Sequence, residues 1–153
     1  MFTLHTERTI AAPPEVVWDV LTDFPNQPEW NPSIVSIECE GLLVAGARIT
    51  FVGPRNAKGG TMKFRPTVLV AEPARELRWL GRLGLPRVFD GEHVFRLEPL
   101  ADGGTRFVQE EHFRGVLVPF LRRMLERDTR AGFTAMNDAL ATRAEERART
   151  AAA

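Results

Sequence analysis

The stretch TERTIAAPPEVVWDVLTDFPNQPEWNP, residues 6–32, carries the clearest local signals in the chain. The prolines and glutamate at positions 13–15 suit a first helical turn, where backbone N–H groups lack partners and a carboxylate meets the positive end of the helix dipole. Val17, Leu21 and Phe24 follow at helical spacing, and another proline comes directly after them. The stretch therefore predicts a short helix that begins at the prolines and ends before residue 25.

Strand signals lie on both sides of this helix. Residues 2–10 place Phe2, Leu4 and Ile10 at even positions among polar residues, which is the period-two pattern of a half-buried strand. Turn-forming residues dominate positions 26–32. Six strand-like stretches then follow, separated by Gly, Pro and Asp-Gly-Gly turns, at residues 34–41, 47–54, 61–73, 76–84, 89–100 and 105–117. The chain thus predicts an antiparallel meander with one apolar and one polar face.

The period changes to helical between residues 118 and 147. The apolar face of this predicted helix contains Leu121, Leu125, Gly132, Met136 and Ala139. Strands and helices do not alternate along the chain, so the meander must bury its apolar face against helices on one side. A broad sheet twists and curls around such a helix, which leaves room for a cavity. We therefore expect one α+β domain over residues 1–150, with about seven strands curved around a long C-terminal helix and short helices after the first strand.

A resemblance to a known superfamily agrees with this architecture. Residues 6–32, with GEHVFRLEPL (91–100), TRFVQEEHFRG (105–115) and the closing helix, resemble the SRPBCC superfamily of helix-grip proteins. That superfamily includes START-related lipid carriers, proteins of the birch-pollen-allergen type, bacterial polyketide cyclases and dehydratases, and catalytic domains of ring-hydroxylating oxygenases. The resemblance implies a deep, largely apolar pocket, and it implies no particular reaction because this fold hosts carriers, sensors and enzymes.

Three polar residues share the predicted apolar face of the sheet. His93 lies an even number of residues from Phe95 and Leu97, so a regular strand places all three on one face. Gln109 and Glu111 share a face with the aromatic residues of their own strand in the same way. An inward histidine beside an inward carboxyl group could act as a general acid–base pair, so His93 and Glu111 are the catalytic candidates. The alternative is that each satisfies a neighbour inside the sheet.

Other side chains are expected to complete the lining of the pocket, with methionines that adapt to irregular ligand shapes. Asp128 is included because it lies one turn from apolar residues of the last helix, although pairing with an arginine is an alternative role for it. For the aromatic residues the alternative is packing in the core. The further lining candidates are Trp30, Asn31, Phe51, Met62, Phe64, Trp79, Phe113, Phe120, Met124, Asp128 and Phe133.

Composition argues against several classes of protein. Twenty basic and twenty acidic residues cancel, so no long-range positive field would recruit nucleic acid. No segment approaches the roughly 20 apolar residues of a membrane helix, and the single cysteine suits a reducing compartment, so we expect a cytoplasmic protein without stable membrane insertion. The three histidines lack metal-ligand spacing, and residues 53–60 lack the end of a phosphate loop and predict a hairpin loop at the pocket mouth. We expect no metal and no cofactor.

The favoured function is binding of a hydrophobic small molecule or lipid-like metabolite, as a monomer or homodimer. A second hypothesis is an enzyme of the polyketide cyclase or dehydratase type that uses His93 or Glu111 to move a proton next to a carbonyl. The absence of tyrosine weighs against it, because a phenol is a common donor to a substrate carbonyl; Trp79, Asn31, Gln109 or His93 would have to replace it. A third hypothesis is a protein-interaction module.

Overall fold

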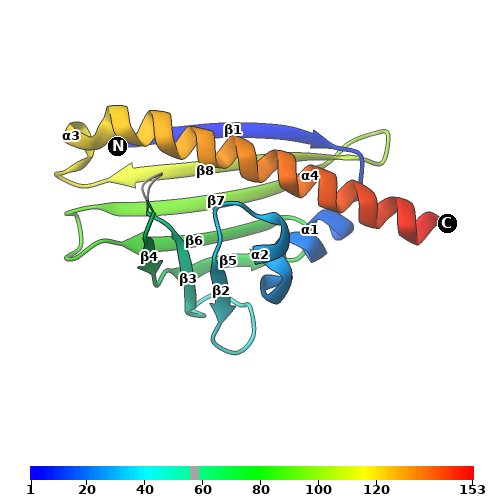
Figure 1. Ribbon diagram of the computed structural model, residues 1–153, viewed down its shortest axis with the longest axis horizontal. Helices are drawn as coiled ribbons and strands as arrows, with labels where there is room; N and C mark the ends of the chain where they lie inside the picture. The colour runs from blue at the N-terminus through cyan, green and yellow to red at the C-terminus, as the bar shows by residue number, and fades with distance from the viewer. Residues whose placement is uncertain (56–58) are drawn as a thin grey trace.

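The computed structural model describes residues 1–55 and 59–153, and residues 56–58, the centre of the expected hairpin loop 53–60, lie outside the described part. In chain order the elements are β1 (Phe2–Ile10), α1 (Pro14–Thr22), the 3₁₀ turn η1 (Phe24–Asn26), α2 (Gln27–Trp30), β2 (Ser36–Cys39), β3 (Ile49–Pro54), β4 (Thr61–Phe64), β5 (Thr67–Glu72), β6 (Glu76–Arg82), β7 (Asp90–Pro99), β8 (Thr105–Arg114), α3 (Val118–Met124), the π-helical turn η2 (Leu125–Thr129) and α4 (Arg130–Ala152). The α+β class and the helix-grip arrangement are confirmed. Helix α4 runs across one face of the curved antiparallel sheet (Figure 1).

The strands form two sheets that continue into each other. The larger sheet has the order β1-β8-β7-β6-β5, and the smaller has the order β2-β3-β4. At the junction Ile49 N–H donates to Pro66 O at 3.0 Å, and Val68 N–H donates to Ala47 O at 2.9 Å. These bonds hold the smaller sheet against the edge strand β5, so the strands curl around the space under α4 (Figure 1).

Residues 61–73, expected as one strand, form two. Pro66 has no N–H for a ladder and separates β4 from β5. Strict alternation would place Val68 and Val70 on one face, but a register shift between them turns Val70 away, and it lies opposite Arg78. The corner between the two sheets is therefore built from a proline and a bulge.

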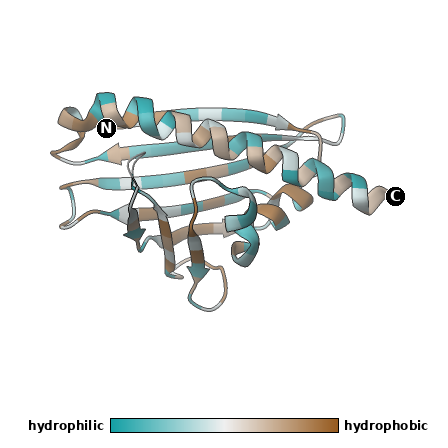
Figure 2. Ribbon diagram, viewed as in Figure 1, coloured by the Kyte–Doolittle hydropathy of each residue, from teal (hydrophilic) through white to brown (hydrophobic). Residues whose placement is uncertain are grey.

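The last helix is continuous but contains a wider turn at η2. A regular helix would continue the stripe through Gly132 and Ala139, as the sequence predicts. Met136 is buried as predicted, but the extra residue of the π turn rotates the following helix, so that Gly132 and Ala139 are only half-buried. The buried positions of α4 are Phe133, Met136, Asn137, Leu140, Ala141 and Ala144. Hydrophilic and hydrophobic residues alternate along α4 (Figure 2), and its exposed positions include Arg130, Asp138 and Arg143.

The apolar interior has two parts. The main cluster joins α1 and α4 to the inner face of the larger sheet and includes Leu21, Phe95, Phe107 and Leu140. A second cluster lies near α3 and consists of Leu4, Phe113, Val118, Leu125 and Phe133, with Phe2, Phe89 and Leu121 packed against it. In the described residues, no helix has the length and apolarity needed to cross a bilayer.

Candidate functional site

Three neighbouring strands bring Trp79, His93 and Glu111 into one row on the inner face of the sheet. His93 on β7 lies directly opposite Trp79 on β6 and Glu111 on β8. Directly opposed residues of antiparallel strands share a face, so all three side chains lie on the same side of the sheet. This is the inner side, as the alternation in the sequence predicts. Gln109 lies two residues before Glu111 and is also buried.

Aromatic rings surround the His93 imidazole. Its ring centroid lies 4.2 Å from that of Phe95, 4.9 Å from that of Phe133 and 5.4 Å from that of Trp79. Even so, the side chains of His93 and Glu111 keep 13% and 18% of their surface accessible. Both groups therefore border space that solvent can enter.

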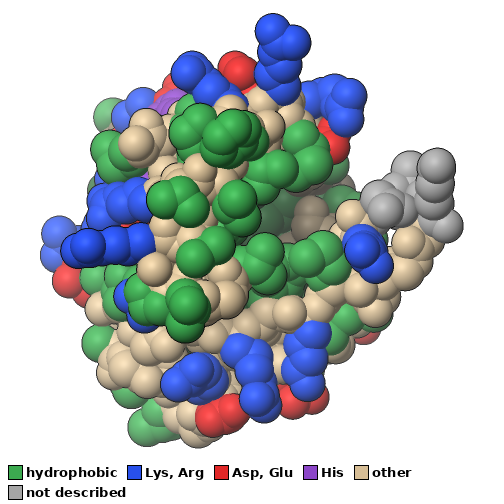
Figure 3. Space-filling model, turned by 90° about the vertical axis from the view of Figure 1, so that its left-hand side faces the viewer, with side chains coloured by type: hydrophobic (Ala, Val, Ile, Leu, Met, Phe, Trp, Pro, Cys, Tyr) green, Lys and Arg blue, Asp and Glu red, His purple; other side chains and the backbone are tan. Residues whose placement is uncertain are grey.

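A hollow is visible at one end of the molecule. Figure 3 shows it from the side where α3 lies in Figure 1, with hydrophobic side chains around its edge and Lys and Arg side chains farther out. This end contains the second apolar cluster, which includes Phe113 and Phe133.

Gly91 makes room for the Glu111 carboxyl group. The two residues lie on adjacent strands, and a Cβ atom at position 91 would come within 2.6 Å of Glu111 Oε1. Any larger residue would have to displace this oxygen, because real Cβ atoms essentially never approach so closely. The missing side chain thus leaves space that the carboxyl group occupies.

Burial disfavours the charged form of both titratable groups. It lowers the pKa of His93 to about 3 and raises the pKa of Glu111 to about 7. The 3.7 Å distance between His93 Nδ1 and Glu111 Oε2 would suit an ion pair, but burial favours the neutral form of each group. Near pH 7 the pair is therefore a neutral imidazole beside a carboxyl group that is about half protonated.

The amide of Gln109 orients the imidazole. Gln109 Nε2 lies 2.9 Å from His93 Nε2, so the amide N–H donates to that nitrogen, and the imidazole proton is on Nδ1, toward Glu111. The same amide nitrogen lies 3.5 Å from Met136 Sδ on α4. Gln109 thus ties the sheet to the helix.

Two buried acceptor oxygens in this region have no hydrogen-bond partner among the described residues: Gln109 Oε1 and Asn137 Oδ1. Asn137 Nδ2 donates to Thr6 Oγ1 at 3.1 Å, and Thr6 lies opposite Gln109 in the β1–β8 ladder. An unsatisfied buried acceptor costs about 1–3 kcal/mol. These oxygens are therefore positions where a donor from water or a bound molecule would be stabilised.

The smaller sheet adds aromatic side chains on the other side of Trp79. Phe51 on β3 stacks on Phe64 of β4 with ring centroids 4.8 Å apart, and it lies 6.5 Å from the Trp79 ring. Met62, also on β4, is half-buried and lies opposite Gly53. The structure thus brings Phe51, Phe64, Trp79 and His93 into one continuous aromatic wall.

Other candidates lie apart from this wall. Asn31 is buried, but its amide accepts from Ser33 N–H and donates to Gln27 Oε1, which holds the turn after α2. Phe120 and Met124 are exposed on α3. Asp128 is exposed in η2 and accepts a hydrogen bond from Arg127 at 2.6 Å, which is the arginine pairing considered as its alternative role.

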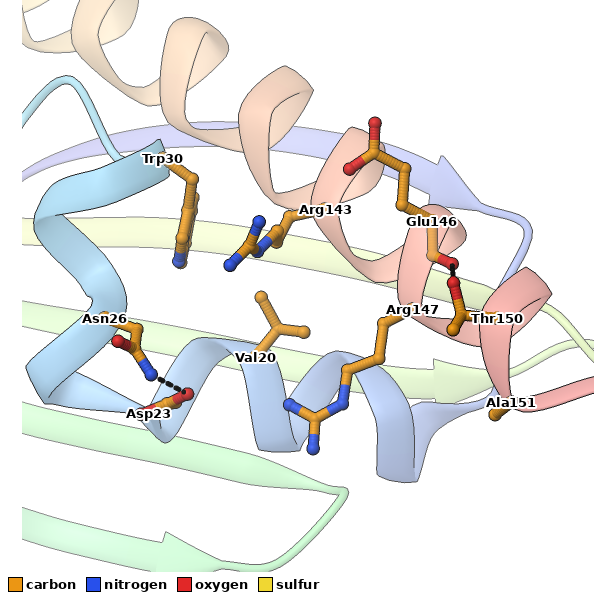
Figure 4. Close-up of a pocket in the computed structure, with 9 residues that line it drawn as sticks. All are labelled: Val20, Asp23, Asn26, Trp30, Arg143, Glu146, Arg147, Thr150 and Ala151. Carbon is orange, nitrogen blue, oxygen red and sulfur yellow. Dashed lines mark hydrogen bonds between the residues drawn. The ribbon is translucent and has the colours of Figure 1, made fainter.

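Trp30 lines a separate surface cleft of about 480 Å³ between α1, α2 and the end of α4 (Figure 4). Arg143 and Arg147 extend from α4 toward this cleft. Both are already paired, with Glu29 at 3.1 Å and Asp19 at 3.8 Å. The cleft is therefore a second, more polar depression away from the His93–Glu111 pair.

Sequence reasoning missed Thr6, Gly91 and Asn137. Thr6 shares the even parity of Leu4 and Ile10, so its inward position could have been found from the alternation in β1. The buried position of Asn137 depends on the rotation at η2, and the role of Gly91 depends on the cross-strand register; neither has a signal in the local sequence.

Comparisons with known proteins agree with this fold. The family profile described as "Polyketide cyclase / dehydrase and lipid transport" matches residues 1–145. Among curated protein sequences none matches significantly.

Solved structures share the fold at low sequence identity. The aromatase/cyclase ZhuI from Streptomyces sp. R1128 superposes with a TM-score of 0.74 at 22% identity, covering 98% of each chain. The protein TTHA0849 from Thermus thermophilus gives 0.75 at 19% identity, covering 95% of this chain and 99% of that one. StfQ, a di-domain aromatase/cyclase of the steffimycin biosynthetic pathway, gives 0.78 at 15% identity, covering 95% of this chain and 52% of StfQ. With the family profile matched over residues 1–145, the chain belongs to the polyketide cyclase/dehydrase and lipid transport family.

Proposed function

We propose that the chain binds a hydrophobic small molecule in the space between the curved sheet and α4. The observation that carries this proposal is the partial exposure of His93 and Glu111 at the centre of a largely apolar face. A polar pair that borders accessible space amid aromatic rings suits a ligand that is mainly apolar and has a few polar atoms. Membership of a family that includes lipid transport supports the same class of ligand.

The unpartnered oxygens narrow the class of ligand. Gln109 Oε1 and Asn137 Oδ1 can accept hydrogen bonds but cannot donate them. A ligand with a hydroxyl or N–H group near its buried end would satisfy one of them, whereas a pure hydrocarbon would leave both unsatisfied. We therefore propose an aromatic or aliphatic molecule with at least one hydrogen-bond donor.

A pair of probes tests this proposal. We expect 2-naphthol to bind several-fold more tightly than 2-methoxynaphthalene, because only the naphthol can donate to Gln109 Oε1, and a net hydrogen bond contributes roughly 0.5–1.5 kcal/mol. Dissociation constants would be measured by calorimetry. In Gln109→Met the difference between the two probes should shrink, because one of the two unpartnered acceptors is removed. Glu110→Gln, a change on the outer face one residue away, is the matched control and should keep the difference. If neither probe binds, the pocket proposal is wrong.

An enzyme of the cyclase or dehydratase type is the second candidate, and the His93–Glu111 pair favours it. A neutral imidazole can take a proton from carbon next to a carbonyl while a protonated carboxyl group gives one to the carbonyl oxygen, which forms an enol. The lone pair of His93 Nε2 faces Gln109, so a substrate would have to displace this hydrogen bond. ZhuI and StfQ, which share the fold, are aromatase/cyclases.

Proton exchange distinguishes the enzyme from a carrier. If the pair is catalytic, the protein should accelerate exchange of the α-protons of α-tetralone in D₂O, measured by NMR. His93→Gln should then reduce that acceleration by about 100-fold or more, the usual contribution of general acid–base catalysis. His112→Gln is the matched control, because His112 lies on the outer face and contacts Thr3. If His93→Gln exchanges protons at an unchanged rate and still binds 2-naphthol, the enzyme hypothesis is excluded and the carrier function remains.

A further inference from the structure

Exposed hydrophobic side chains gather at the end of the molecule where the hollow opens. Of the eleven large hydrophobic residues exposed in the described part of the chain, six belong to the connection between β6 and β7, the connection between β8 and α3, or α3 itself. We call this set the apolar rim; it consists of Leu83, Leu85, Val116, Leu117, Phe120 and Met124. Figure 3 shows hydrophobic side chains around the hollow on this face.

Backbone bonds hold the segments of the apolar rim together. Val116 N–H donates to Arg87 O at 3.1 Å, and Leu117 N–H donates to Val88 O at 3.2 Å. Within the first connection, Leu83 N–H donates to Phe89 O at 2.9 Å. The apolar rim is therefore one surface with a fixed arrangement, although its parts are more than 25 residues apart in sequence.

The two segments that carry the apolar rim are basic. Residues 82–89 and 113–125 contain five arginines and no acidic residue, in a chain whose twenty basic and twenty acidic residues cancel. The five are Arg82, Arg87, Arg114, Arg122 and Arg123. Arg82 lies 3.6 Å from Asp90; within the described residues the other four have no carboxylate within ion-pair distance. The positive charge is therefore local to the apolar rim.

Folding does not explain these side chains. Phe120 is 85% exposed, so its burial contributes almost nothing to the core. Arg122 does have a local contact, with its guanidinium 5.1 Å above the Phe2 ring, but it remains exposed. A contiguous apolar patch edged by cations indicates a contact surface.

We propose that the apolar rim docks this protein on an anionic lipid bilayer. Hydrophobic side chains that enter the boundary between headgroups and acyl chains, with arginines beside the phosphates, are the combination that binds such surfaces. The apolar side chains lie around an opening, and a fluid bilayer can cover this shape without a complementary protein. Docking would place the opening of the hollow against the membrane, where a hydrophobic molecule could enter without crossing water. The docking itself does not depend on the identity of the ligand.

Vesicle co-sedimentation tests the docking. We expect binding to vesicles of phosphatidylcholine with phosphatidylglycerol, much weaker binding to phosphatidylcholine alone, and loss of binding as salt is raised. Arg122→Gln/Arg123→Gln should lower the partition coefficient by about 30-fold, since each basic residue near an anionic surface contributes roughly fivefold. Arg75→Gln/Arg149→Gln removes the same charge from exposed sites elsewhere, just before β6 and near the end of α4, and should have little effect.

The apolar contribution has its own control. Phe120→Ser should lower partitioning about tenfold, whereas Leu42→Ser, an exposed leucine between β2 and β3, should not. Equal binding to neutral and anionic vesicles, or no loss in either rim variant, would overturn the proposal. Binding to an acidic carrier protein without binding to vesicles would overturn it too. A protein that binds 2-naphthol as expected but ignores anionic vesicles would refute the docking and leave the proposed ligand site intact.

Discussion

Replacing Phe107 with alanine should lower the free energy of unfolding by about 3–5 kcal/mol, the usual cost of removing a fully buried phenylalanine. Phe107 has no exposed surface and lies on β8, which is bonded to a strand on each side. Its ring stacks on that of Phe95 with centroids 5.9 Å apart. Phe107 lies four residues before Glu111 on β8 and so shares its face of the sheet. The substitution leaves a cavity that surrounding side chains can fill only in part. Urea unfolding followed by tryptophan fluorescence measures the loss.

Phe120→Ala is the matched control for Phe107→Ala. It removes the same atoms from a side chain that is 85% exposed, so we expect a change within about 0.5 kcal/mol. A loss of several kcal/mol at position 120 would mean that α3 packs in solution against something that the chain alone does not provide. A small loss of unfolding free energy in Phe107→Ala would contradict the conclusion that the main core lies on the inner face of the sheet.

Alternation along β7 and β8 was sufficient to predict which polar side chains lie on the inner face. His93, Gln109 and Glu111 follow from parity alone, since a strand repeats every two residues and both strands are regular over ten residues. The helix after the first strand and the long C-terminal helix could likewise be predicted from local signals.

Features that depend on an inserted residue or on register could not be predicted in this way. One extra residue at η2 moves the buried face of α4 from Gly132 to Phe133 and brings Asn137 inward. One bulge in β5 turns Val70 outward. Periodicity carries no information about where such an insertion occurs, and the buried face is displaced after it. In α4 the displacement leaves Met136 buried but moves Gly132 and Ala139 to the edge of the buried face. The contact between Gly91 and the Glu111 carboxyl group depends on register across two strands and has no local signature.

Replacing Glu111 with glutamine should raise the free energy of unfolding by about 3 kcal/mol at pH 8. Burial raises the pKa of Glu111 from 4.5 to about 7, and each pKa unit corresponds to about 1.4 kcal/mol. Below pH 4.5 the carboxyl group is protonated in both the folded and the unfolded state, so it makes no difference to stability. Between pH 4.5 and 7 the unfolded chain has released the proton and the folded chain still holds it, so the wild-type protein loses stability as pH rises. Above pH 7 the loss is complete.

The glutamine variant lacks this titration, so the stability difference between variant and wild type should grow from near zero at pH 4.5 to its full value at pH 8. His93 has the opposite effect, because burial lowers its pKa to about 3 and the wild-type protein loses stability as pH falls below 6.5. That contribution is common to both proteins and cancels in the difference. Urea unfolding at several pH values between 4.5 and 8 measures the curve.

Glu110→Gln is the control with the opposite sign. Burial alone would raise the pKa of Glu110, but the hydrogen bond with His5 and the charge of Arg96 outweigh burial and lower the pKa. The Glu110 carboxylate therefore stabilises the fold above pH 4.5, and glutamine there should reduce stability at pH 8. If Glu111→Gln also reduced stability at pH 8, the Glu111 carboxylate would be satisfied by its neighbours and would have only a structural role. A gain would mean that the chain retains a carboxyl group at its centre at a cost in stability. Such a cost is expected of a group that acts on a bound molecule, and this experiment detects it without knowledge of the ligand.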